Sequence, residues 1–527
     1  MSALLTIPSL VEPLAAPQVP WEVLIPVMII LGGAVVGVLV EAFAPFKARR
    51  PIQIMLSLVA VLSALVVVVW RWTSVVNVPQ VLPEYVEDTL TLAAQAILLV
   101  IAFLALLVIA DRSEIGDGAF AAQPSDRPGS SDEDVSIAKG YQRTEIFPLT
   151  LFSLGGMMVF PAATSLVALF VALEVMSLPL YIMAATARRR RQLSQESALK
   201  YFVLGAFASA FFLMGGALLY GVTGSLNLSD IARMAPMSVN MEWVVIVGIL
   251  GVLIGLLFKV GAAPLHAWTP DVYQGAPTPI TGFMAAAVKV AAFATLVRFY
   301  LTVAQPFQWD LAWIVGGVAV LTMLVGTFAG LVQKDIKRLL AYSSIAHAGF
   351  VLVGILALQA TTASSVLFYL LGYGIATVGA FAVVALVRHA DTQGNVTGEA
   401  TEMARWAGLG RKSPLMAGAM LLFLLSFAGI PLTSGFIGKF VVFADGIAGG
   451  YLGLVILALV CSAITAFYYF RLVVLMFFTE PDENTVVVKS EGYSVIAVAL
   501  SAVATLVLGI AAQPILDLLS HVVVLLP

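Results

Sequence analysis

The sequence predicts an all-α membrane protein with about fourteen transmembrane helices. Of its 527 residues, 61% are hydrophobic and 11% are charged, whereas a soluble domain has roughly 45–50% apolar and about 25% charged residues. The apolar residues form continuous runs of the ~20 residues that a helix needs to cross a membrane, unlike the short alternating segments of a membrane barrel. These observations exclude a soluble enzyme, a nucleic-acid-binding protein and a disordered chain.

Fourteen apolar runs are long enough to be transmembrane helices. They cover residues 22–44, 52–72, 89–110, 146–162, 164–186, 198–221, 242–263, 278–303, 309–331, 338–358, 364–388, 413–443, 450–477 and 493–519. Most of the eight tryptophans lie near the ends of these runs, where an amphipathic ring prefers the membrane interface. The tryptophans therefore support the count.

The basic residues between the runs predict the orientation. If the runs alternate in direction, nineteen of the 27 Lys and Arg residues lie on one side, and three lie on the other. Cytoplasmic loops carry the excess of Lys and Arg, so the rich side is expected to be cytoplasmic and both termini are expected outside. The long polar insert 111–145 falls on the cytoplasmic side, and its acidic, Pro- and Ser-containing composition predicts a flexible linker, with partner docking as the alternative.

The sequence carries no pattern for a redox centre or a nucleotide site. Its single cysteine, Cys461, cannot form a disulfide framework. Its four histidines are scattered, and no zinc-ligand spacing or phosphate-binding glycine motif is present. Any redox or nucleotide chemistry is therefore expected on a partner.

The other five basic residues lie inside the apolar runs, and the acid Glu174 lies in the middle of one. A charge there costs at least ~2.5–3.5 kcal/mol on insertion scales and is interpreted as functional by default. These ionisable residues are Glu174, Lys200, Lys259, Lys289, Lys439 and Arg471. Lys200 is close enough to the start of its run to snorkel or to pair with Glu196 at i,i+4, and Arg471 can also snorkel. Lys289 lies too deep in its run to snorkel. For Glu174, the alternative to a functional role is a buried carboxyl in its neutral form.

Two of the lysines lie beside predicted helix breaks, in the seventh and twelfth runs. Lys259 precedes Gly261 and Pro264, and Lys439 follows Gly429 and Pro431. Proline frees backbone carbonyls, which membrane proteins tolerate only within protein or beside water. A simple packing kink is the alternative for each break.

The two breaks lie five runs apart, and GAAPLH (261–266) resembles AGIPLT (428–433). Interrupted helices at corresponding places indicate an inverted-repeat transporter. The prediction divides the chain into N-terminal helices 1–3 (1–110), the acidic cytoplasmic loop (111–145), two five-helix repeats with broken helices 7 and 12 (146–305 and 306–479), and a C-terminal helix 14 (480–527). In this scheme Glu174 corresponds to His347, which is either a proton-relay group or a satisfied core residue.

Four segments carry a resemblance to a known family. They are ALKYFVLGAFASAFF (198–212), FKVGAAPLHAWTPDVYQGAPTPITGFMAAAVKVAAF (258–293), KDIKRLLAYSSIAHAGF (334–350) and GIPLTSGFIGKFVVF (429–443). The chain resembles the antiporter-like membrane subunits of proton-translocating NADH–quinone oxidoreductase, respiratory complex I, over about 150–480. The lysine at 439 favours the subunit N branch over the related subunit M. The family shares its core with Mrp-type sodium/proton antiporter subunits.

The resemblance implies a role for each buried group. Glu174 would pair with Lys259 as a switch, and Lys289 would link this pair to the cytoplasmic half-channel. Lys439 would pass the proton to the periplasmic side or onward. Lys200 and His347 would be auxiliary relay groups. Quinone reduction elsewhere in the complex would drive the transfer.

The resemblance also implies the setting of the chain. It would lie in a bacterial plasma membrane beside other antiporter-like subunits of complex I. It would hold no cofactor or metal itself, because NADH, FMN, iron–sulfur clusters and quinone would be bound by partner subunits. Two alternatives stay open at this point: a cation/proton antiporter subunit of an Mrp-type assembly, and a scaffold whose charges only hold helices together.

Overall fold

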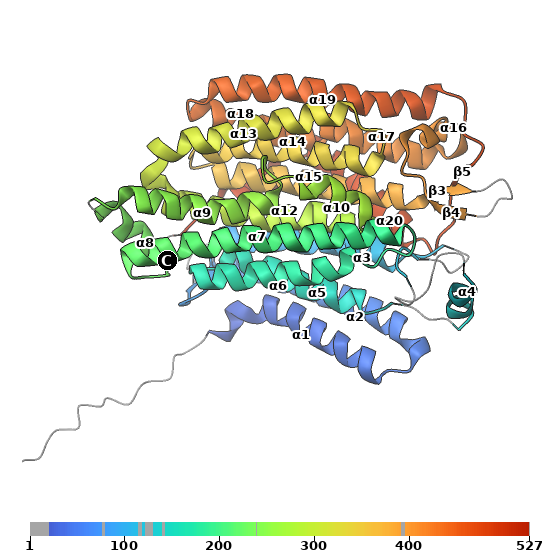
Figure 1. Cartoon of the computed structure of the whole chain (residues 1–527), viewed down its shortest axis with the longest axis horizontal. Helices are drawn as coiled ribbons and strands as arrows, with labels where there is room; N and C mark the ends of the chain where they lie inside the picture. The colour runs from blue at the N-terminus through green and yellow to red at the C-terminus, as the bar shows by residue number, and fades with distance from the viewer. Residues whose placement is uncertain are drawn as a thin grey trace, which may run out of the picture.

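The computed structural model describes residues 20–75, 80–113, 118–121, 130–139, 143–238, 240–390 and 396–525. In this part of the chain, eleven helical stretches are long and apolar enough to cross a membrane, and two shorter apolar helices accompany them. The long helices run side by side along the longest axis of the molecule (Figure 1). The predicted all-α membrane fold is confirmed, while the count of fourteen spans and the inverted repeat stay predictions.

The N-terminal helices form one side of the bundle. They are α1 (Trp21–Phe43), α2 (Phe46–Val75) and α3 (Thr89–Ala110), with a short hairpin of β1 (Gln80–Val81) and β2 (Val86–Glu87) between α2 and α3. Asp88 caps α3 by accepting a 2.9 Å hydrogen bond from the Thr91 backbone N–H. Such a cap satisfies one of the orphan donors of a helix start.

The next elements cover the first predicted repeat. They are α5 (Ile146–Val159), η1 (Phe160–Ala162), α6 (Leu166–Ala184), α7 (Arg191–Thr223), α8 (Leu228–Met234), η2 (Ala235–Met237), α9 (Glu242–Val260), α10 (Trp268–Gly275), α11 (Thr278–Phe283), η3 (Met284–Val288), α12 (Lys289–Phe299), η4 (Tyr300–Ala304) and η5 (Gln305–Phe307). Two of them, η3 and η4, are π-helical turns. The predicted runs 278–303 and 309–331 are joined here, because helical turns continue from Thr278 to Leu331.

The second predicted repeat and the C-terminus follow. Their helices are α13 (Gln308–Leu331), α14 (Ile336–Leu356), α15 (Thr362–Leu386), η6 (Met403–Trp406), α16 (Leu409–Lys412), α17 (Pro414–Ala428), α18 (Ser434–Ala448), α19 (Leu452–Phe478), α20 (Tyr493–Ile510) and α21 (Gln513–Ser520). The core lies around α14 and α15, where 94% of each span is buried, against 39% of α2 and 33% of α20. His347 on α14 is therefore enclosed by protein.

Both predicted helix breaks are present. Helix α9 ends at Val260 and α10 begins at Trp268, while α17 ends at Ala428 and α18 begins at Ser434. Each first half ends on a left-handed glycine, with φ 75° at Gly261 and φ 80° at Gly429. Glycine suits this position because it has no Cβ to clash with the following carbonyl.

The loops hold structure that the sequence did not predict. Strands β3 (Val387–Ala390), β4 (Val396–Glu399) and β5 (Thr485–Val487) form a sheet in the order β4-β3-β5. Within the predicted flexible insert 111–145, the structure has a two-turn helix α4 (Ser131–Ala138). Figure 1 shows α4, α16 and this sheet at one end of the bundle, opposite α8 and the C-terminus. Residues 1–19 lie outside the part of the chain that the structure describes.

Candidate functional site

Lys259 lies in the last turn of α9, two residues before the first break, and is 2% exposed. Its Nζ donates a long 3.4 Å hydrogen bond to the hydroxyl of Tyr181 on α6. The ammonium also lies 5.4 Å from the ring centroid of Tyr181 and 5.3 Å from that of Tyr201. Because aromatic faces attract a desolvated cation, the rings and one hydroxyl hold this lysine.

Glu174 does not form the ion pair with Lys259 that the family resemblance implies. Glu174 is half-buried on α6, and its Oε1 accepts a 2.6 Å hydrogen bond from Ser209 Oγ on α7. Glu174 and Tyr181 are seven residues apart and share one face of α6. Tyr181 therefore connects α6, the helix of Glu174, to Lys259. A hydrogen bond with Ser209 takes the place of the expected ion pair between Glu174 and Lys259.

Lys289 connects the two halves of the chain. It begins α12, directly after the π-helical turn η3, and is 3% exposed. Its Nζ donates to the carbonyl of Val260 at 2.8 Å and to the carbonyl of Ser344 at 2.7 Å. The Val260 carbonyl ends α9 at the first break, next to Lys259, and the Ser344 carbonyl belongs to α14. One ammonium thus bridges the first break and the buried helix of the second half.

His347 lies one turn beyond Ser344 on α14 and is 4% exposed. Its Nδ1 is 2.6 Å from the hydroxyl of Tyr369, and its Nε2 is 3.4 Å from the hydroxyl of Tyr469. Tyr469 in turn shares a hydrogen bond with Ser343. The histidine is therefore the centre of a buried network of hydroxyl groups, each of which can donate and accept.

A small cavity of about 10 Å³ lies between this network and the second break. Its lining residues are His347, Tyr369, Tyr373, Ser426, Phe427 and Gly435. A buried cavity holds water when polar groups line it and about one probe sphere fits inside. The cavity lies between His347 and the end of α17.

Lys439 lies on α18, after the second break, and is 6% exposed. Its Nζ donates to the carbonyls of Phe427 at 2.8 Å and Ala428 at 3.0 Å, and to Ser462 Oγ at 2.7 Å. The two carbonyls are the last of α17, where the helix dipole is negative. Lys439 therefore caps a helix end as well as supplying a titratable group.

Lys200 and Arg471, the two residues for which snorkelling is an alternative, are held by ordinary contacts. Lys200 is 43% exposed and pairs with Glu196 at 2.7 Å, as the i,i+4 alternative predicts, and also with Asp271 at 2.8 Å. Arg471 does not extend freely to the interface. It donates to the Leu331 carbonyl at 2.8 Å and the Gln333 carbonyl at 2.7 Å, capping α13.

Sequence reasoning missed two acids near these groups. Asp271 on α10 binds both Lys200 and Arg338, the latter at 2.7 Å. Asp445 is 7% exposed on α18, and its Oδ1 accepts a 2.6 Å hydrogen bond from Thr361 Oγ1. The signal for Asp445 was present, because it lies just beyond the predicted apolar run 413–443 on the same helix as Lys439.

Together, these features define a membrane protein with a row of buried ionisable groups that passes through two helix breaks. The model of the family described as NADH:quinone oxidoreductase/Mrp antiporter, TM, matches residues 163–465, more than half of the chain. The NADH-quinone oxidoreductase subunit N of Beutenbergia cavernae is 54% identical over 96% of this chain and 98% of that protein. The chain belongs to this family, and within it to the subunit N proteins.

Solved structures agree with this assignment. A chain of respiratory complex I from Thermus thermophilus, solved with bound aureothin, matches with a TM-score of 0.76 and 32% identity over 94% of this chain and all of that chain. A chain of the Mrp complex from Dietzia sp. DQ12-45-1b matches with a TM-score of 0.80 and 19% identity over 95% of this chain and 97% of that chain. At that identity the Mrp match shows a common fold alone.

Proposed function

We propose that this chain is a membrane-arm subunit of a NADH–quinone oxidoreductase and that it moves protons along the row Glu174, Lys259, Lys289, His347 and Lys439. The observation that carries the proposal is the position of Lys289. Its ammonium binds the carbonyl at the first break and a carbonyl of α14, so it joins the two halves of the row. Intramembrane ionisable groups of this kind are typical of proton relays.

The first step of the proposed transfer is a switch between Glu174 and Lys259. A nearby carboxylate favours the protonated form of a lysine, and withdrawal of the carboxylate favours proton release. In this structure Ser209 holds the carboxylate and Tyr181 contacts the ammonium, which corresponds to the separated state of the switch. Movement of Glu174 towards Lys259 would give the paired state.

The second step carries the proton from Lys289 to Lys439. His347 and its hydroxyl partners lie on the route, and the cavity beside His347 opens towards the end of α17. Water in this cavity would complete the hydrogen-bonded path. Asp445, six residues beyond Lys439 on α18, extends the row towards the end of the bundle opposite the β3–β5 sheet.

The partners and the setting are part of the same proposal. Other membrane subunits of the oxidoreductase flank this chain, and NADH, FMN, iron–sulfur clusters and quinone are bound by partner subunits of the complex. The membrane is the bacterial plasma membrane, with the end that holds α4 and the β3–β5 sheet in the cytoplasm and both termini outside. The excess of basic residues at the α4 end supports this orientation.

The test is proton pumping by the whole complex with Lys289→Met, measured with a pH-sensitive dye in inverted vesicles given NADH. We expect an assembled complex with the redox-group content of the wild type and about tenfold or more slower pumping. Lys47→Met, which removes an exposed basic residue outside the row, is the matched control and should pump normally. An assembled Lys289→Met complex that pumps at the wild-type rate would falsify the proposal.

The same vesicles test the antiporter alternative. Sodium-driven proton movement without NADH oxidation would assign the chain to an Mrp-type assembly. Pumping that needs NADH and does not change when choline replaces sodium supports the oxidoreductase.

A further inference from the structure

A groove with a volume of about 600 Å³ lies beside the last turns of α19. This volume is within the range of about 300–1,000 Å³ that ligand sites occupy. Three segments line the groove: the α13–α14 connection at 333–334, the start of η6 at 402–404, and α19 between 471 and 479. None of these segments contributes a residue to the row that runs from Glu174 to Lys439.

Hydrogen bonds hold the three segments together. Arg471 on α19 donates to the carbonyls of Leu331 at 2.8 Å and Gln333 at 2.7 Å. The backbone N–H of Met403 donates to the carbonyl of Lys334 at 2.8 Å. The groove is therefore formed without a ligand, as most ligand sites are.

Two cations of the lining have donors left for an anion. Lys334 is exposed, and the described residues give its ammonium no ion pair. The Arg471 guanidinium makes three contacts, with the two carbonyls and with Met403 Sδ, so two of its five N–H donors remain. The one acid of the lining, Glu402, already pairs with Arg405 at 3.0 Å. The groove is therefore electrostatically suited to a negative group.

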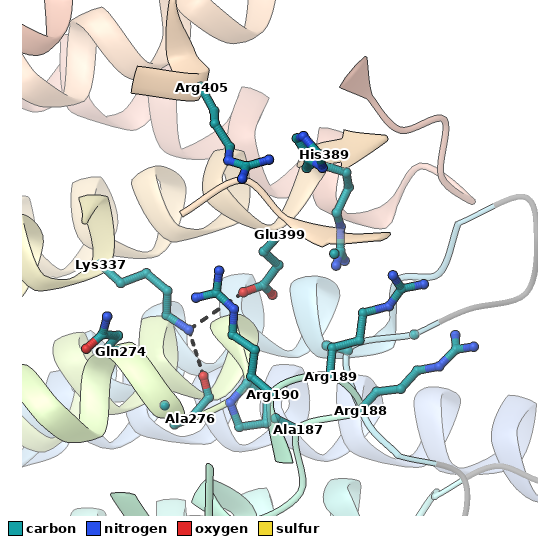
Figure 2. Close-up of a pocket in the computed structure, with 16 residues that line it drawn as sticks. Ala187, Arg188, Arg189, Arg190, Gln274, Ala276, Lys337, His389, Glu399 and Arg405 are labelled. Carbon is teal, nitrogen blue, oxygen red and sulfur yellow. Dashed lines mark hydrogen bonds and ion pairs between the residues drawn. The ribbon is translucent and has the colours of Figure 1, made fainter. Parts of the chain in front are cut away.

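The neighbouring basic cavity, shown in Figure 2, is smaller. Its volume is about 170 Å³, below the range of ligand sites. Its Lys337 already donates to the Ala276 carbonyl at 2.7 Å and lies 3.7 Å from Glu399 Oε2. The arginines around this cavity are Arg188, Arg189, Arg190, Arg388 and Arg405. The volume therefore favours the groove as the ligand site.

The groove continues into an apolar surface on α13 and α19, both parts of candidate membrane spans. Figure 1 shows α19 along one edge of the bundle, with α13 near it. Phe470, Val474 and Phe478 are exposed on α19, and their four-residue spacing places them on one face. Phe328 and Val332 are exposed at the end of α13. An acyl chain could follow this surface from the groove into the membrane.

We propose that the groove binds an anionic phospholipid, in the leaflet at the end of the bundle that holds the β3–β5 sheet. Its phosphate would lie between Lys334 and Arg471, and an acyl chain would follow Val474 and Phe470. Basic pockets between transmembrane helices bind anionic headgroups in this way. Because Arg405 already neutralises Glu402, the two cations favour an anionic lipid over a zwitterionic one.

The length of the groove favours a lipid over a transmembrane helix of a partner. The groove borders α19 only between residues 471 and 479. A helix that crosses the membrane has about 20 apolar residues to cover, so it would need a groove along the whole of α19. The short basic groove at the end of the span instead matches one headgroup and the first part of its acyl chains.

Photo-crosslinking with two lipid probes tests the proposal. The purified complex is placed in phosphatidylcholine nanodiscs that contain a trace of photoreactive phosphatidylglycerol or photoreactive phosphatidylcholine, and labelled peptides are identified by mass spectrometry. The phosphatidylglycerol probe should label segments 402–404 and 471–479, and unlabelled phosphatidylglycerol should compete with it. Equal labelling by both probes, as bulk lipid would give, overturns the proposal. So does no labelling by either probe, as a covering subunit would give.

A charge variant tests the headgroup contact. Lys334→Gln should lower phosphatidylglycerol labelling about fivefold, because one basic residue near the membrane surface contributes about that factor. Labelling by the phosphatidylcholine probe should not change. Lys47→Gln removes another exposed lysine, outside the groove, and should be labelled like the wild type. Wild-type labelling of Lys334→Gln contradicts the proposal.

A second variant fills the groove and leaves its charge unchanged. Val474→Trp should also reduce labelling by the phosphatidylglycerol probe at equal complex content. Val495→Trp is the matched control, because Val495 is an exposed valine on α20 outside the groove. Equal labelling of the two tryptophan variants would place the lipid outside the groove and overturn the proposal.

Discussion

The two helix breaks hold their lysines in opposite ways. At the first break, Lys259 precedes the break and is surrounded by aromatic rings, with one long hydrogen bond to Tyr181. At the second break, Lys439 follows the break and makes three hydrogen bonds, two of them to the carbonyls that end α17. The backbone of both breaks is similar, because each first half ends on a left-handed glycine.

The same backbone geometry can therefore support the two different roles proposed for these lysines. Lys259 has few fixed partners, so in the proposed switch its proton affinity would follow the position of a nearby carboxylate such as that of Glu174. Lys439 is held by backbone carbonyls. These carbonyls stay in place and do not take up a proton. Lys259 at the first break therefore suits a switch. Lys439 at the second break suits a proton-transfer group that stays in place and also stabilises a helix end.

The largest expected effect comes from removing each lysine in turn. Lys259→Met and Lys439→Met should both slow pumping by about tenfold or more, measured in NADH-driven vesicles. Only Lys439→Met removes the donor to the buried Phe427 carbonyl, at a cost of about 1–3 kcal/mol, so it should also lower the amount of assembled complex on native gels. Equal assembly of the two variants would contradict the difference between the breaks.

The glycines of the breaks give the next effect. A Cβ at Gly429 would lie 2.9 Å from Lys439 Cδ, whereas a Cβ at Gly261 would lie 2.9 Å from Thr269 Oγ1. Both alanine variants pay about 1–2 kcal/mol for the left-handed conformation, but only Gly429→Ala displaces a lysine. We expect Gly429→Ala to pump more slowly than Gly261→Ala at equal complex content.

Gly224→Ala is the control for strain alone. Gly224 has φ 70°, and nothing lies within 4 Å of its Cβ position. This variant should lower stability without slowing pumping per assembled complex. Slow pumping by Gly224→Ala would mean that strain by itself explains the effects at the breaks.

A smaller effect is expected from Gly205→Ala on α7. The new Cβ would lie 2.1 Å from the Tyr181 hydroxyl, so the tyrosine must move away from Lys259. We expect about three- to tenfold slower pumping, because small displacements of reacting groups reduce rates strongly. Gly221→Ala on the same helix has nothing within 4 Å of its Cβ and should pump normally; a matching loss in both variants would rule out Tyr181 as the cause.

The smallest effect compares the single hydroxyl partners of the two lysines. Tyr181→Phe removes a 3.4 Å hydrogen bond and Ser462→Ala removes a 2.7 Å one. Because hydrogen bonds weaken with length and Lys439 keeps two carbonyl partners, we expect each variant to pump within about threefold of the wild type. The pH dependence of pumping should shift in Tyr181→Phe and stay unchanged in Ser462→Ala.

Much of the candidate site could be predicted from the sequence, because charge is rare in the apolar runs. Lys259, Lys289 and Lys439 stand out there, and Gly–Pro spacing indicated both breaks. The partners of these residues could not be predicted. Ser209 for Glu174, the Val260 and Ser344 carbonyls for Lys289, and Ser462 for Lys439 come from other helices, whose faces meet only after packing.

The membrane fold, the two breaks and the set of buried charges could be predicted from local sequence patterns, since hydropathy and backbone chemistry are local properties. The tertiary structure decided which of these charges meet. It separated Glu174 from Lys259, joined the halves through Lys289, and gathered Arg188–Arg190, Arg388 and Arg405 around one cavity. In the sequence those arginines indicated only which side is cytoplasmic. Contacts between residues hundreds of positions apart depend on helix packing, which local sequence patterns do not encode.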